Sequence, residues 1–126
     1  MRRSLSVVCA AIACVLPSAS PVHAAPKENG LFLMVSGKQG TWLRAIGIYC
    51  PGRADQHPYG RVVCDLLADV DGDFNRLPGD AHLCTDEKDP VTATATGTWG
   101  NRRISWKKTF SSACLLDEAT APVFRF

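Results

Sequence analysis

Residues 91–110 constrain the fold of this chain more than any other segment. Threonines at positions 92, 94, 96 and 98 alternate with small or apolar residues, which is the period of a strand with two unlike faces. Gly100 and Asn101 follow, and a glycine at the first central position of a two-residue loop favours a type II′ turn. We therefore predict a β-hairpin that pairs Ala95 with Trp106, so that small residues lie opposite large ones.

The first 24 residues have the features of a signal peptide. Arg2 and Arg3 give a basic start, and residues 5–16 form an apolar run that is too short to span a bilayer. Residues 22–24 match the small-residue pattern that signal peptidase reads. We predict a signal peptide over residues 1–24 and one secreted, extracellular domain over residues 25–126. Lipidation at Cys14 is an alternative, because residues 11–14 faintly resemble a lipidation box without its leading leucine.

Charge argues against two classes of partner. The chain has 14 basic and 12 acidic residues, and two of the basic ones lie in the leader. The domain is therefore close to neutral, whereas nonspecific binding to nucleic acid or to an anionic membrane needs a basic excess. No second hydrophobic segment follows the leader, so we predict neither partner. We interpret the cationic residues of the hairpin as a solvent-exposed rim and not as a nucleic-acid-binding patch. These residues are Arg102, Arg103, Lys107 and Lys108.

Four cysteines follow the leader, at positions 50, 64, 84 and 114. An even number in a short exported chain predicts two disulfides. Three pairings are possible, and the cysteine positions alone do not choose between them.

Hydrophobic patterns predict the remaining elements. The apolar run at residues 31–35 indicates a buried strand, and alternation over residues 44–50 indicates another. Apolar residues over 63–70 recur at helical spacing, which predicts an amphipathic helix, followed by a short helical turn around Phe74. Residues 123–126 alternate like a last strand. About five strands with one or two helices predict an α+β fold with an antiparallel sheet, because so few helices cannot cover a parallel one.

Catalytic and metal-binding patterns are weak. The sequence has no nucleophile elbow, no H-E-x-x-H motif and no phosphate-binding glycine loop, so we predict no catalytic residue, no cofactor and no enzyme. We interpret His57 as a hydrogen-bonding residue of a polar loop, and His82 as an ordinary surface residue or one that faces a partner. Residues 69–75 resemble the start of a calcium loop, but Phe74 stands where such loops need glycine. A helix terminus rich in turn-forming residues is the better interpretation, with no metal.

Residues 83–91 form a charged, extended segment that runs from a cysteine to a proline. We expect a surface loop that is pinned at both ends. Taken by itself, this pattern also fits an ordinary polar loop.

A series of short motifs along nearly the whole domain resembles the Streptomyces subtilisin inhibitor family. The thirty-residue spacing from Cys84 to Cys114, and the four residues between Cys84 and Asp89, carry the resemblance better than composition does. The motifs are RAIGIYCPG (44–52), HP (57–58), CDL (64–66), GDFNRL (72–77), DPV (89–91), GTW (97–99), RIS (103–105), Phe110 and VFRF (123–126).

The resemblance implies a fold and an assembly. The expected fold is a five-stranded antiparallel sheet packed by two helices. The implied disulfides join Cys50 to Cys64 and Cys84 to Cys114. Members of the family associate as homodimers through the sheet, and our candidate dimer contacts are Phe32 and Trp99.

The resemblance also implies inhibition of an extracellular serine protease through a substrate-like loop. Carried over residue by residue, the scissile bond joins Asp86 to Glu87, and Asp86 enters the specificity pocket of the protease. The rest of the protease-binding loop consists of Leu83, Cys84, Thr85 and Lys88.

Asp86 departs from the better-known members, which carry Met, Lys or Arg at this position. A carboxylate buried in the apolar pocket of subtilisin costs on the order of several kcal/mol. We therefore predict a target that accepts acidic side chains, such as a glutamyl endopeptidase. Two alternatives stay open: inhibition of a secreted metalloprotease, or a noncatalytic secreted binding or substrate protein, either a calcium-loop module or a cross-linking substrate, without inhibitory activity.

Overall fold

The structure is a computed structural model that describes residues 10–21, 29–51 and 56–126. Residues 10–21 are exposed and have no regular secondary structure. The predicted signal-peptidase site at residues 22–24 lies outside the described residues. No helix in the described part of the chain is long and apolar enough to cross a membrane.

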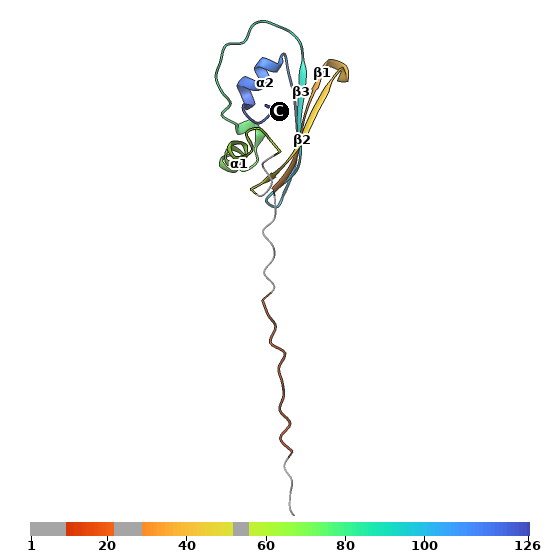
Figure 1. The fold of residues 1–126 in the computed structure, drawn as a ribbon, viewed down its shortest axis with the longest axis vertical. Coiled ribbons are helices and arrows are strands. Elements are labelled where there is room, and N and C mark those ends of the chain that lie inside the picture. Colours follow the sequence, from red (N-terminus) through yellow and green to blue (C-terminus); the bar gives the residue numbers. More distant parts are fainter. Residues whose placement is uncertain (1–9, 22–28, 52–55) are drawn as a thin grey trace, which may run out of the picture.

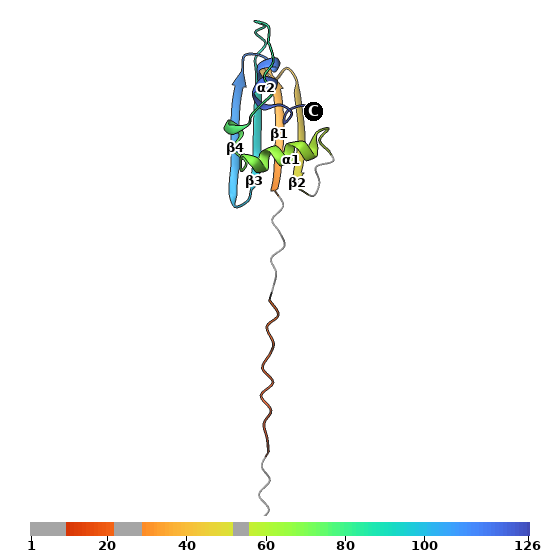
Figure 2. The same cartoon turned by 90° about the vertical axis from the view of Figure 1, so that its left-hand side faces the viewer.

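An antiparallel sheet forms one layer of the domain. Its strands are β1 (Asn29–Gly37), β2 (Leu43–Cys50), β3 (Val91–Trp99) and β4 (Arg102–Phe110), with the short 3-10 helix η1 (Lys38–Gly40) between β1 and β2. The spatial order is β2-β1-β3-β4, so β1 and β3 are central and β2 and β4 are the edges, as Figure 2 shows face-on.

The hairpin prediction is confirmed residue by residue. Ala95 pairs with Trp106, and Trp99 pairs with Arg102. Gly100 has a φ of 59°, whereas Asn101 is not left-handed. A positive φ at the first central residue alone is the pattern of a type II′ turn.

Two α-helices cover one face of the sheet (Figure 1). The first, α1 (Gly60–Asp69), is the predicted amphipathic helix, and the short 3-10 helix η2 (Phe74–Arg76) follows it. The second, α2 (Ala113–Thr120), lies in a segment for which the sequence analysis predicted no helix. Ser112 caps α2, because its Oγ accepts a hydrogen bond of 3.2 Å from the Leu115 amide.

The core lies between the helices and the sheet. Alternate residues of β1 and β3 face inward, and they meet Val63 and Leu67 of α1, which are fully buried. Phe74 and Phe124 both approach Trp106, with ring centroids 5.2 and 5.8 Å from the tryptophan ring. Ala95, a small and fully buried residue of β3, lies opposite Trp106, as the hairpin prediction requires.

The sheet has four strands in the described residues, so the prediction of five is wrong. Residues 123–126, expected to be the last strand, form turns in which the Val123 amide bonds to the Thr120 carbonyl and the Arg125 amide bonds to the Pro122 carbonyl. Val123 and Phe124 are buried under the helical layer. These two buried residues are adjacent, unlike the alternate buried residues of a strand with one covered face, and no strand in the described residues pairs with the segment.

Within residues 10–21, 29–51 and 56–126, no α-helix lies on the far face of the sheet (Figure 1). The apolar run of β1 was expected to be buried, and its inward residues Leu31, Leu33 and Val35 are. Phe32 points to the far face and is 50% exposed. One face of this central strand is therefore covered and the other is open.

Candidate functional site

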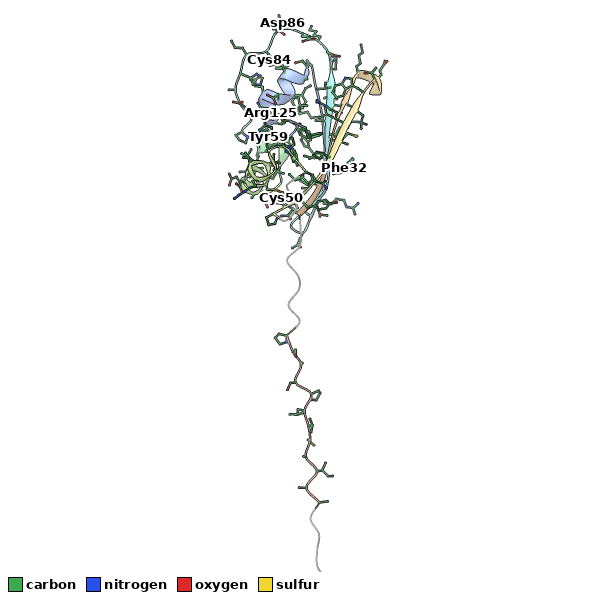
Figure 3. The ribbon with its side chains drawn as sticks, in the orientation of Figure 1. Phe32, Cys50, Tyr59, Cys84, Asp86 and Arg125 are labelled. Atoms are coloured by element: carbon green, nitrogen blue, oxygen red, sulfur yellow. A yellow bond between two sulfur atoms is a disulfide. The ribbon has the colours of Figure 1, made fainter. Side chains whose placement is uncertain are left out.

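The segment between η2 and β3 forms an arch at one end of the molecule (Figure 3). It has no regular secondary structure and bends at Asp86. The side chains predicted to meet a protease, Leu83, Thr85, Asp86, Glu87 and Lys88, are all exposed, and Leu83 is completely so. The arch thus presents consecutive side chains to solvent.

A disulfide ties the arch to α2. It joins Cys84 to Cys114, and a second disulfide joins Cys50 at the end of β2 to Cys64 in α1. Both pairings implied by the resemblance are confirmed. Cys114 lies in the first turn of α2, two residues after the capping residue Ser112, so the disulfide is anchored in regular structure.

The upstream base of the arch lies against the end of α2. Gly79 has a φ of 65°, and a Cβ there would lie 2.1 Å from the Glu118 carbonyl oxygen. A side chain is therefore excluded by both the backbone conformation and the space. The next residue, Asp80, donates its amide to the Glu118 carbonyl at 2.9 Å.

A charged network supports this base. The guanidinium of Arg125 donates through Nε and Nη2 to the two carboxylate oxygens of Asp117, at 2.7 and 2.8 Å, and Nη2 also reaches Oδ2 of Asp80 at 3.2 Å. Oδ2 of Asp117 also lies 3.0 Å from Nε2 of His82. The hydrogen bonds from Arg125 hold the pKa of Asp117 below its ordinary value, against the opposing effect of partial burial. The Asp117 carboxylate in turn raises the pKa of Arg125.

His82 faces inward. Its Nδ1 lies 3.7 Å from Sγ of Cys84 and 3.6 Å from Sγ of Cys114. These three side chains are the one group of metal-ligand type in the described part of the chain. The two sulfurs are bonded to each other, so neither is a thiolate ligand.

His57 lies in the core, away from the arch. Its Nε2 is 2.8 Å from the Val123 carbonyl, and its Nδ1 accepts the Tyr59 amide at 3.0 Å. Because Nδ1 accepts, Nε2 carries the proton of a neutral ring, and burial lowers the pKa of His57. The prediction of a hydrogen-bonding loop histidine is confirmed.

The calcium-like segment is occupied by structural contacts. Asp71 pairs with Arg102 at 3.0 Å, and Asp73 accepts the Asn75 amide at 3.0 Å at the start of η2. The Asn75 side chain accepts Nε1–H of Trp106 at 3.0 Å. Asp71 and Asn75 thus fasten the turn after α1 to β4, and Asp73 caps η2 locally. Helix α1 ends at Asp69, so the segment is a helix terminus, as interpreted from the sequence.

A family model described as subtilisin inhibitor-like matches residues 29–112, which is more than half of the chain. The chain belongs to the subtilisin inhibitor-like family. Relatives agree along most of its length. Subtilisin inhibitor-like protein 5 of Streptomyces fradiae is 36% identical over 78% of this chain and 97% of its own. The subtilisin inhibitor of Streptomyces violaceus is 34% identical over 92% of each chain.

The fold of this subtilisin inhibitor-like chain also matches a solved structure. It is the crystal structure of Streptomyces caespitosus sermetstatin in complex with Bacillus licheniformis subtilisin, with 34% identity and a TM-score of 0.61 over 79% of this chain and 98% of the other. The relatives are inhibitors by name and not enzymes, which supports the prediction that this chain is not an enzyme.

The two candidate dimer residues of this inhibitor-like domain lie on opposite faces of the sheet. Phe32 is on the open face (Figure 3), whereas Trp99 is 6% exposed and packs over Gly72 on the helical side. A Cβ on Gly72 would lie 2.7 Å from the Trp99 ring, so this glycine permits the packing. The two residues therefore do not form one surface.

Proposed function

We propose that this chain is a secreted inhibitor of an extracellular serine protease and that the arch is its substrate-like loop, with Asp86–Glu87 as the reactive bond. The observation that carries the proposal is the exposed run of residues 85–89 between two fixed points, the Cys84 disulfide and the start of β3. A loop already held in an extended form loses little conformational freedom when it enters a protease cleft.

The same anchoring explains inhibition instead of digestion. After attack on the Asp86 carbonyl, the new amine of Glu87 stays next to the acyl-enzyme, because the disulfide and β3 hold both sides of the bond. Religation at high effective concentration then competes with hydrolysis.

The charge of the arch favours a target with a basic cleft. Three exposed carboxylates surround the proposed bond, Asp86, Glu87 and Asp89, against the single cation Lys88. The fourth carboxylate of the arch, Asp80, is paired with Arg125. Opposite charge on a partner steers association and suits a pocket that accepts an acidic side chain. We infer a glutamyl-type endopeptidase as the target.

The test is a titration of the oxidised protein against a glutamyl endopeptidase, subtilisin, trypsin and a secreted metalloprotease, followed by mass spectrometry of the inhibitor. We expect stoichiometric inhibition of the first enzyme, with cleavage confined to the Asp86–Glu87 bond. Asp86→Leu should improve inhibition of subtilisin by about a hundredfold, since it removes an unpaired carboxylate from an apolar pocket. Lys88→Leu, a change of similar size in the same loop, is the control.

Other outcomes of this titration separate the alternatives. Inhibition of trypsin alone would make Lys88 the specificity residue. Inhibition of the metalloprotease with the bond intact would move the site off the arch. A folded protein that inhibits none of the four would be a binding or substrate protein.

We also propose that the inhibitor is a homodimer that buries the open face of the sheet. On that face a hollow of about 450 Å³ is lined by Phe32 and Tyr49 together with the glycines at positions 30, 47 and 97. An apolar central strand with one uncovered face is typical of a buried contact. Phe32→Asp should shift the sedimentation of the protein to that of a monomer, whereas Leu83→Asp, which introduces the same charge at an exposed leucine of the arch, should leave it unchanged.

A further inference from the structure

The upstream half of the arch is held by few backbone contacts. Residues 77–84 belong to no strand or helix, and the Asp80 amide makes one backbone hydrogen bond, to Glu118. The downstream half enters β3, whose ladder with β1 and β4 begins at Val91. The disulfide holds this half at Cys84, and the residues between Gly79 and Cys84 depend on side-chain contacts for their position.

Arg125 is placed to supply that support. Its backbone is fixed by the core, since the neighbouring residues Val123 and Phe124 are buried and the Val123 carbonyl receives His57. Its guanidinium forms a two-pronged contact with Asp117 and reaches Asp80 with the same Nη2. Two parallel charge-assisted hydrogen bonds fix the orientation of the guanidinium relative to the carboxylate, as well as the distance between the two groups.

The network continues from Asp117 into the arch. Oδ2 of Asp117, held by Arg125, is also the partner of His82 Nε2, and the other ring nitrogen of His82 lies against both sulfurs of the disulfide. His82 is four residues upstream of the proposed specificity residue Asp86. Figure 3 shows Arg125 below Cys84, on the helical side of the sheet.

We propose that Arg125 is a positioning residue for the arch, acting on Asp80 directly and on His82 through Asp117. Its role in inhibition rests on the function proposed above, but its role in ordering the arch does not. Half-exposed ion pairs contribute little to global stability. The effect of removing Arg125 is therefore local, because segments with few contacts open independently of the rest of the domain.

The experiment compares Arg125→Ala and Arg125→Lys with a control, Arg103→Ala, which removes an exposed arginine of β4 outside the network. Two quantities are measured on the oxidised proteins: hydrogen exchange of peptides that cover residues 77–90, and the rate of hydrolysis at Asp86–Glu87 by a glutamyl endopeptidase. Near-ultraviolet circular dichroism and thermal unfolding report the state of the core.

We expect Arg125→Ala to speed exchange in the upstream half of the arch by about tenfold, the factor for loss of one charge-assisted hydrogen bond. Hydrolysis should speed up as well, while the association rate with the protease changes little. Arg125→Lys should retain only part of the exchange protection, because lysine keeps the positive charge but lacks the planar guanidinium that donates two parallel hydrogen bonds. Exchange in Arg125→Ala equal to that in Arg103→Ala would overturn the proposal.

Two further outcomes are decisive. If Arg125→Ala unfolds, His82→Gln replaces it, and unchanged exchange of the arch in this variant overturns the proposal. If the wild-type protein inhibits no protease while Arg125→Ala still loosens the arch, the positioning role stands and the inhibitory function fails.

Discussion

The two disulfides lie in unlike regions of the molecule. Cys50 and Cys64 are 3% and 8% exposed, and they join β2 to α1 within the hydrophobic core. Cys84 and Cys114 are both partly exposed, and they join the arch to α2 beside polar side chains. Many apolar contacts surround the first bridge, whereas a few directional hydrogen bonds surround the second. Under the function proposed above, stability and recognition are carried by different regions, and substitutions should separate them.

Removing the arch disulfide should have the largest effect. With Cys84→Ser/Cys114→Ser, the amine released by cleavage is no longer held near the acyl-enzyme. We expect hydrolysis at Asp86–Glu87 to speed up by roughly 10²- to 10⁴-fold, the range over which tethering acts. The measurement is the return of protease activity with time after mixing. An inhibitor that lasts as long as the wild type would show that the bridge does not protect the bond.

Removing the core disulfide should lower stability and spare inhibition. Cys50 and Cys64 are 14 residues apart, and the chain-entropy model gives about 3 kcal/mol for a loop of this size. Urea unfolding of Cys50→Ser/Cys64→Ser should show this loss, with an inhibition constant within a few-fold of wild type. A large loss of inhibition by a protein that is still folded would mean that the two regions are coupled.

Two glycines with similar φ allow a finer comparison. Gly79 at the arch base and Gly100 in the hairpin turn have φ values of 65° and 59°. Among the described residues, no further side chain or backbone atom lies within 4 Å of a Cβ at Gly100, whereas a Cβ at Gly79 would meet the Glu118 carbonyl. Gly100→Ala should cost about 1–3 kcal/mol, because this position of a type II′ turn needs a positive φ that side chains disfavour. Gly79→Ala should cost more and should also weaken inhibition, as thermal unfolding and titration would show; equal costs would argue against the close approach at Glu118.

Acid should affect the two regions in different pH ranges. Burial lowers the pKa of His57 from its ordinary 6.5. As pH falls below about 6.5, His57 therefore takes up a proton more readily in the unfolded chain than in the folded chain. The contribution of His57 is complete above pH 6.5 and falls as pH drops, by at most about 1.4 kcal/mol per pH unit. Arg125 holds the pKa of Asp117 below 3.8, so the contribution of the arch base is complete above that pH and is lost on further acidification.

Urea unfolding of the wild type and of His57→Gln from pH 7 to pH 5 tests the predicted contribution of His57 to stability. The wild type should lose stability more steeply than the variant. Parallel pH profiles would show that His57 does not titrate differently in the folded and unfolded states. Hydrogen exchange of the arch below pH 4, measured in the wild type and in Asp117→Asn, tests the predicted contribution of Asp117.

The sequence predicted the parts of this fold that local patterns determine. The hairpin register follows from strict alternation and a two-residue turn, and α1 follows from apolar spacing. Helix α2 was missed because it is only eight residues long and its leucines are adjacent, although Ser112 is a capping signal. The last strand was predicted wrongly because a short apolar–polar pattern does not distinguish a strand from turns, and here the adjacent residues Val123 and Phe124 both pack into the core from turns.

The site was predictable only in part, for a related reason. The position of the loop and its disulfide came from the family resemblance. The contact of Arg125 with Asp80 joins residues 45 positions apart, and no pattern along the chain indicates such a contact. The inward orientation of His82 likewise depends on α2, the helix that the sequence analysis missed.

The two edge strands of the sheet differ in their tendency to pair with another molecule at high protein concentration. An unpaired strand edge is a template on which another chain can form a cross-strand ladder, and charged side chains oppose this. Edge strand β4 carries Arg102, Arg103, Lys107 and Lys108, whereas edge strand β2 carries Arg44 alone. At high protein concentration, accidental strand pairing and fibril growth should therefore begin at β2, while mutual repulsion keeps the β4 edges of neighbouring molecules apart.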